Sequence, residues 1–104
     1  MIDVTTMTRR EARELTEKAV KTLHDAYRAT VDQGPAATVK ASIEAQGEDM
    51  TRYALYQIVN VHSHDGRISP RNRRKAAAVQ TYPKYAGDTI HMAHVDQLMS
   101  ALPD

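Results

Sequence analysis

The sequence predicts an all-α fold, a compact bundle of four to five short helices in one domain spanning residues 1–104. Apolar residues recur at helical spacing through most of the chain, and Gly and Pro interrupt that pattern at intervals typical of short helices. The β-branched residues Ile58, Val59 and Val61 would suit a strand, but no other segment offers a partner strand, so we assign them to a helix. We expect residues 1–7 to form a flexible N-terminal segment.

The first helix is predicted to begin after Thr8 and to end near Asp32, because Gly34-Pro35 cannot continue it. Thr8 and Glu11 have the spacing of a capping box, in which each side chain bonds the backbone amide of the other residue. The stripe predicted to face the core comprises Ala12, Leu15, Ala19, Leu23, Ala26, Tyr27 and Thr30. The opposite face is charged, and its predicted i,i+4 pairs are Glu14–Lys18 and Glu17–Lys21.

A second helix is predicted over residues 36–46, with Pro35 in its first turn and Gly47 ending it, packed on the first helix as an αα-hairpin. The third helix is predicted to take Asp49 as its N-cap and to run through Val61. Apolar residues wrap most of its circumference, which indicates burial on several sides. The side chains that the second helix is expected to bury are small and apolar: Ala36, Val39, Ile43 and either Ala41 or Ala45.

The rest of the chain is predicted to hold a turn at residues 62–68, a fourth helix at 69–79, and a final helix that starts at residue 88 or 89 and runs to 102. Ser69 suits the N-cap of the fourth helix, and Pro70 suits its first turn.

The composition excludes several classes of function. The 14 basic and 13 acidic residues give a net charge of +1, which argues against binding a polyanion through overall charge. The absence of Cys excludes a disulfide scaffold and thiolate chemistry. No apolar run approaches the ~18 residues of a membrane span, and no signal-peptide pattern opens the sequence, so we expect a cytoplasmic protein without membrane contact. The core has no Phe or Trp, and we hypothesise that either a partner or a second copy, forming a homodimer, completes it.

The most unusual feature is a group of basic residues around the start of the predicted fourth helix. This basic cluster comprises Arg67, Arg71, Arg73, Arg74 and Lys75. Cations at a helix N-terminus are disfavoured by the helix dipole, so stability alone does not explain them. Free backbone amides, the dipole and the arginines would together hold a phosphate or carboxylate, which indicates nucleic acid or an acidic protein surface as the partner. The alternative is a solvated face whose arginines pair with carboxylates of neighbouring helices. No aromatic residue is interleaved, so base stacking is not indicated.

A second candidate is a metal site at His62, His64, Asp65, His91 and His94. His91 and His94 lie at i,i+3 and can share one metal ion. However, the chain has no HExxH motif and no Cys, and a histidine on an apolar stripe is more often a core residue bonded to a backbone carbonyl. We therefore predict no metal and no cofactor.

Catalysis finds little support. Ser63 and Ser69 lie near histidines, but groups that adjoin on one turn rarely align as nucleophile and base, and no glycine-rich phosphate loop is present. We predict that the protein is not an enzyme. Tyr82 and Tyr85 flank Pro83 and are candidates for contact with a protein partner, the alternative being that they cover one end of the bundle.

Two segments, DGRISPRNR at residues 65–73 within 53–78 and IHMAHVDQL at residues 90–98, resemble uncharacterised small helical proteins of bacterial phages and conjugative elements. The resemblance implies a mobile-element setting and carries over no catalytic or binding residue; such proteins often bind host or nucleic-acid machinery. Our leading hypothesis is a non-enzymatic helical binding module that contacts nucleic acid or an acidic protein surface through the basic cluster. The alternatives are an adaptor or inhibitor of a host protein, acting through Tyr82 and Tyr85, and a metal-binding helical protein.

Overall fold

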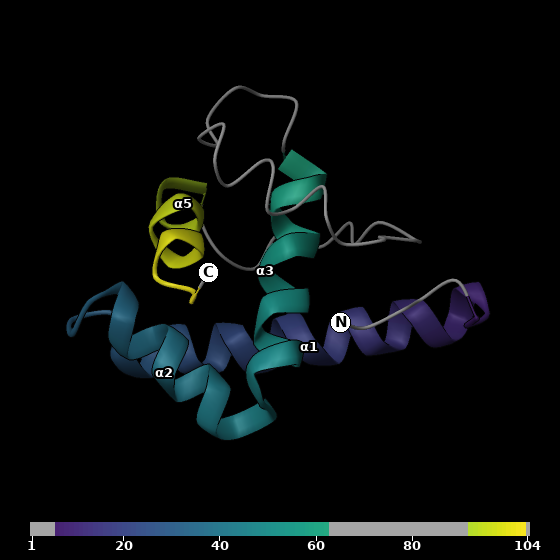
Figure 1. Ribbon diagram of the computed structural model, residues 1–104, viewed down its shortest axis with the longest axis horizontal. Helices are drawn as coiled ribbons and strands as arrows, with labels where there is room; N and C mark the ends of the chain where they lie inside the picture. Colours follow the sequence, from purple (N-terminus) through teal and green to yellow (C-terminus); the bar gives the residue numbers. More distant parts are fainter. Residues whose placement is uncertain (1–5, 63–91, 104) are drawn as a thin grey trace.

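The prediction of an all-α bundle is confirmed. The computed structural model describes residues 6–62 and 92–103, and in these ranges every regular element is a helix. In chain order these are α1 (Arg9–Thr30), α2 (Pro35–Gln46), α3 (Glu48–His62) and α5 (Met92–Ser100). Helix α2 packs along α1, α3 stands across α1, and α5 lies beside α3 and over α2 (Figure 1). The helix predicted over residues 69–79 lies outside the described residues.

The start of α1 is fixed by the predicted capping box. The Glu11 amide donates to Thr8 Oγ1 and the Thr8 amide donates to Glu11 Oε1, each over 3.1 Å. Directly before this cap, Met7 is partly buried against the core. Helix α1 ends at Thr30, slightly earlier than predicted, and Gly34 then takes a φ of +102°, a left-handed conformation that favours glycine. The chain can therefore reverse between α1 and α2 within a few residues.

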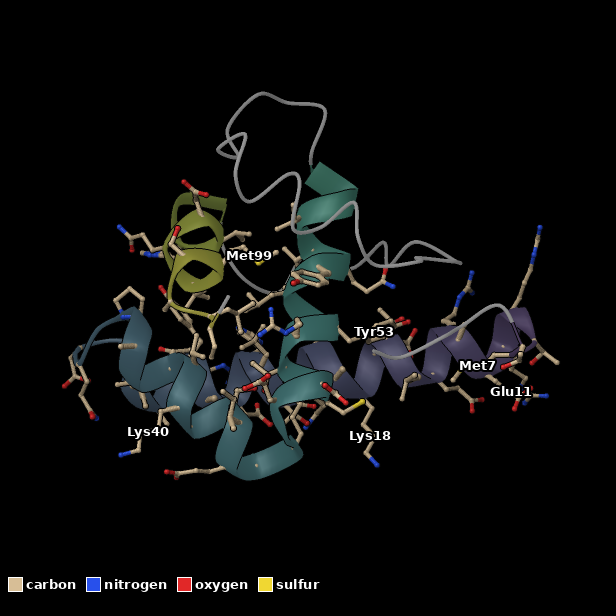
Figure 2. All side chains as sticks on the ribbon, in the orientation of Figure 1. Met7, Glu11, Lys18, Lys40, Tyr53 and Met99 are labelled. Carbon is tan, nitrogen blue, oxygen red and sulfur yellow. The ribbon has the colours of Figure 1, made fainter. Side chains whose placement is uncertain are left out.

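The two faces of α1 are largely as predicted. Its buried residues are Ala12, Thr16, Ala19, Val20, Leu23, Ala26 and Thr30, while Leu15 and Tyr27 are partly buried. The predicted ion pairs are wrong: among the described residues, the ion pairs of this helix are Arg10–Glu14 at 3.4 Å and Lys21–Asp25 at 3.5 Å. Figure 2 shows Lys18 pointing away from the helix. These side chains are well exposed, so each pair contributes about 0–1 kcal/mol at most.

The buried face of α2 differs from the prediction. Its fully buried residues are Thr38, Val39 and Ser42, whereas Ala36 and Ala45 are exposed. Hydroxyl groups can be buried here because each finds a hydroxyl on a neighbouring helix. Thr38 Oγ1 lies 2.6 Å from Thr30 Oγ1 of α1, and Ser42 Oγ lies 2.7 Å from Thr51 Oγ1 of α3. The polar face of α2 can therefore pack in the interior, because its buried hydroxyl groups keep hydrogen-bond partners.

Helix α3 begins directly after Gly47, not after an Asp49 cap as predicted. Gly47 has a φ of +90°; its amide donates to the carbonyl of Ile43 over 2.8 Å, and its carbonyl accepts from the Thr51 amide over 3.1 Å. One glycine therefore ends α2 and starts α3, and Asp49 lies within the first turn of α3. Burial on several sides is confirmed, since residues 53–59 are all buried.

The C-terminal end of the described chain is held against α3. Helix α5 buries Val95, Leu98 and Met99, and Leu102 follows them into the core. Arg52 Nη2 donates to the carbonyl of Pro103 over 2.7 Å, and its Nη1 donates to the Tyr56 hydroxyl over 3.0 Å. The bond to Tyr56 is the main cause of the raised pKa of Arg52. Residues 88–91, part of the predicted final helix, lie outside the described residues.

None of the helices in the described ranges is long and apolar enough to cross a lipid bilayer.

Candidate functional site

Most residues of the three predicted sites lie outside the part of the chain that the structure describes. These are the whole basic cluster (Arg67, Arg71, Arg73, Arg74 and Lys75), the pair Tyr82 and Tyr85, and His64, Asp65 and His91 of the predicted metal site. Of the metal candidates, His62 is the last residue of α3 and His94 lies in the first turn of α5. The structure therefore leaves the basic cluster a prediction and places only one candidate side chain, that of His94.

His94 lies against α1. It is half-buried, and the centroid of its ring lies 5.2 Å from the centroid of the Tyr27 ring, with the two planes inclined at 45°. This separation and tilt are within the range that aromatic pairs favour. The aromatic partner of His94, Tyr27, comes from the predicted core face of the first helix.

Beside this ring pair is a pocket of about 130 Å³. Its walls come from three helices and one turn: Tyr27 from the end of α1, Val31 and Gly34 from the following turn, Pro35 and Thr38 from the start of α2, and His94, Gln97 and Leu98 from α5. The pocket exists because α5 packs over the corner at which α1 turns into α2. No single helix forms this pocket on its own.

The lining of the pocket is mixed in character. Val31, Pro35 and Leu98 supply aliphatic surface, and Tyr27 and His94 supply ring faces or edges. The Thr38 hydroxyl is bonded to the Thr30 hydroxyl. Val31 is 54% exposed, and among the described residues it is the only large hydrophobic side chain that is exposed. An apolar side chain thus lies at the surface beside an open pocket.

A second unusual position is Gln57 in the middle of α3. Its side chain is completely buried, and neither Nε2 nor Oε1 has a hydrogen-bond partner among the residues that the structure describes. Gln46 differs from it, because the Gln46 amide donates to the Ala19 carbonyl over 3.1 Å and to Ser42 Oγ over 3.0 Å. A buried amide without partners destabilises the fold, so Gln57 lowers the stability of the core that surrounds it.

Within the described ranges, no group of three or more His, Cys, Asp or Glu side chains could hold a metal ion. The other members of the predicted metal site fall outside those ranges, apart from His94 and the helix-terminal His62. His94 itself is paired with an aromatic ring.

Comparison with protein family models, with curated proteins and with solved structures finds no match to this chain.

The pocket was not predicted from the sequence. Val31 and Gln97 carry no motif, and Tyr27 was expected simply to fill the core. The one available signal was Gly34-Pro35, which marks the turn that forms one wall of the pocket but says nothing of the helix that packs against it.

Proposed function

We propose that the protein is a non-enzymatic helical binding module whose basic cluster contacts the phosphates of nucleic acid. The observation that carries the proposal is the concentration of positive charge in one segment of the sequence. Residues 63–91 hold six of the 14 basic residues and only two of the 13 acidic residues. The rest of the chain has an excess of acidic residues, so the net charge of +1 hides a strongly basic segment.

The position of the cluster supports the same partner. Four of its five residues fall in the first two turns of a predicted helix, where the dipole adds to their positive potential. Contacts of this kind bind the nucleic-acid backbone without reading its sequence. The described helices offer no comparable surface, since the arginines of α1 are interleaved with Glu11, Glu14 and Glu17.

The test is a titration of labelled random duplex DNA, and separately of single-stranded RNA, at about 50 and 200 mM salt. The variant changes Arg71, Arg73 and Arg74 together to Ala. Affinity should fall steeply with salt for the unchanged protein. The triple change should lower the magnitude of the log–log salt slope by about 0.9 for each duplex phosphate that the protein no longer neutralises.

The matched control removes three arginines from α1, by changing Arg10, Arg13 and Arg28 to Ala. The total charge then falls equally while the basic cluster stays intact. If both triple variants weaken binding equally, only net charge matters and the basic cluster is not the site. Absence of binding at the lower salt concentration would reject nucleic acid as the partner and leave an acidic protein surface to be tested by pull-down.

A second candidate function is that of an adaptor or inhibitor of a host protein, acting through Tyr82 and Tyr85. The pair flanks Pro83, and tyrosines are enriched among the residues that carry most of the binding energy of protein interfaces. Binding of such a partner would change little with salt, which distinguishes it from phosphate contact. The metal-binding alternative is tested by elemental analysis of protein purified without a histidine tag, and stoichiometric zinc or nickel would support it.

The proposal also includes a cytoplasmic location in a mobile-element setting and assembly as a homodimer. The last point rests on the sequence, which has no Phe or Trp to fill a core. Light scattering at high protein concentration tests it, and a monomeric mass would remove the homodimer.

A further inference from the structure

We infer that the pocket between Tyr27, Pro35 and Leu98 binds a single small aromatic ring that carries a hydrogen-bonding substituent, such as a phenol. This inference concerns a site separate from the basic cluster and does not depend on the proposed function. It rests on the size of the pocket, the character of its walls and the polar groups that line it.

Size restricts the occupant to about one ring. Pockets for drug-sized ligands have volumes of roughly 300–1,000 Å³, whereas an apolar cavity of about 150 Å³ is large enough to bind benzene. The pocket here has about 130 Å³.

The walls favour an aromatic occupant over an aliphatic one. The rings of Tyr27 and His94, 5.2 Å apart and inclined at 45°, can receive a third ring in an offset or edge-to-face arrangement. Pro35 and Leu98 complete the apolar surface. Contacts between aromatic rings bind more tightly than the burial of an equal aliphatic area would. The difference corresponds to about two- to tenfold in affinity.

The polar lining indicates that the ring has a substituent. Gln97 is exposed, and its amide can both donate and accept a hydrogen bond. The Tyr27 hydroxyl adds a further polar group. A phenol fits this combination, since its ring fills the apolar volume and its hydroxyl can bond at the rim. The same chemistry is offered by a free phenol and by a tyrosine side chain of a protein partner.

The test is a titration of ¹⁵N-labelled protein with p-cresol, followed by two-dimensional NMR. We expect saturable shifts of the Val31, Gly34 and Leu98 amides, and nuclear Overhauser contacts from the cresol ring to the methyl groups of Val31 and Leu98. A Gly-Tyr-Gly peptide forms the second arm. If the peptide binds as tightly as p-cresol, the ring is a side chain of a partner; if only p-cresol binds, the ligand is a free phenol.

Three variants complete the experiment. Gln97→Trp places a bulky ring at the mouth of the pocket from an exposed position, and it should weaken p-cresol binding at least about tenfold. The control is Ala45→Trp, at an exposed position of α2 away from the pocket, which should leave p-cresol binding unchanged. Tyr27→Leu should weaken binding about two- to tenfold by removing an aromatic wall. The inference is overturned if the unchanged protein shows no saturable shift at these amides up to the solubility limit of p-cresol, or if neither Gln97→Trp nor Tyr27→Leu alters binding.

Discussion

The hydroxyl groups of Thr16 and Tyr53 lie 2.9 Å apart, although 37 residues separate them in the sequence. Thr16 Oγ1 also lies 2.8 Å from the carbonyl of Ala12, to which it donates, so the Tyr53 hydroxyl is the donor to Thr16. Tyr53 lies where α3 crosses α1 (Figure 2). This bond therefore joins the two longest described helices at their crossing, inside the core.

Tyr53→Phe should destabilise the protein by about 1 kcal/mol, because it removes one buried hydrogen bond and leaves Thr16 with its bond to Ala12. Urea denaturation measures the change in the free energy of unfolding. The control is Tyr27→Phe, since the Tyr27 hydroxyl has no hydrogen bond to a described residue; this variant should differ from the unchanged protein by less than about 0.5 kcal/mol. Equal effects of the two changes would contradict a contribution from the Thr16–Tyr53 bond.

The two buried or part-buried glutamines predict effects of opposite sign. Gln57→Met replaces an amide without partners by an apolar chain of similar shape and should stabilise the fold by about 1–3 kcal/mol. Gln46→Met removes an amide bonded to Ala19 and Ser42 and should destabilise the fold by about 1–2 kcal/mol. Thermal and urea denaturation of both variants measure the difference. A decrease in stability in Gln57→Met would mean that its amide has a partner, such as a buried water molecule.

Helices α1 and α2 explain why the sequence predicted one buried face well and the other poorly. In α1, apolar residues recur with the helical period and a capping box marks the start. The buried face and the first residue of the helix can therefore be predicted from the local sequence. In α2, Thr38 and Ser42 occupy the buried face, and they are buried because Thr30 and Thr51 supply hydroxyl partners from other helices. Hydrophobic periodicity cannot predict the burial of a polar residue, because its hydrogen-bond partner lies elsewhere in the chain.

The candidate sites differ in the same way. The basic cluster is nearly contiguous in sequence, so it could be proposed from charge alone. The pocket requires α5 to lie over the turn between α1 and α2, and its lining residues come from positions as distant as Tyr27 and Leu98. Only the packing of the helices brings them together.

The capping box predicts a pH dependence at the start of α1. Hydrogen bonds from the Thr8 backbone amide, and secondarily from its side chain, hold the pKa of Glu11 below its ordinary value of 4.5. Because the pKa is lowered in the folded protein, the contribution of the ionised carboxylate to stability is fully present above about pH 4.5 and is lost as the pH falls through the folded-state pKa. An NMR titration of the Glu11 carboxyl carbon and the Thr8 amide proton measures this transition.

Glu11→Gln provides the control for this titration, because a glutamine can keep the bond to the Thr8 amide but does not ionise. The Thr8 amide should then show no acid transition, while Glu17→Gln, at an exposed position of the same helix, should leave it in place. A Glu11 midpoint above 4.5 in the folded protein would contradict the bond seen in the structure.

Arg52 predicts how firmly the C-terminal end of the described chain is attached. Its guanidinium bonds the Pro103 carbonyl and the Tyr56 hydroxyl and lies 3.5 Å from Glu48 Oε2. Arg52→Met keeps the apolar stem and removes these interactions, and since the side chain is 23% exposed we expect a global destabilisation of only about 1 kcal/mol.

The larger effect of Arg52→Met should be local, as faster hydrogen exchange of the Ala101 and Leu102 amides, which bond carbonyls at the end of α5. Arg10→Met, at an exposed position of α1, is the matched control. Unchanged exchange at Ala101 and Leu102 in Arg52→Met would show that the burial of Leu98, Met99 and Leu102 holds this end without the arginine.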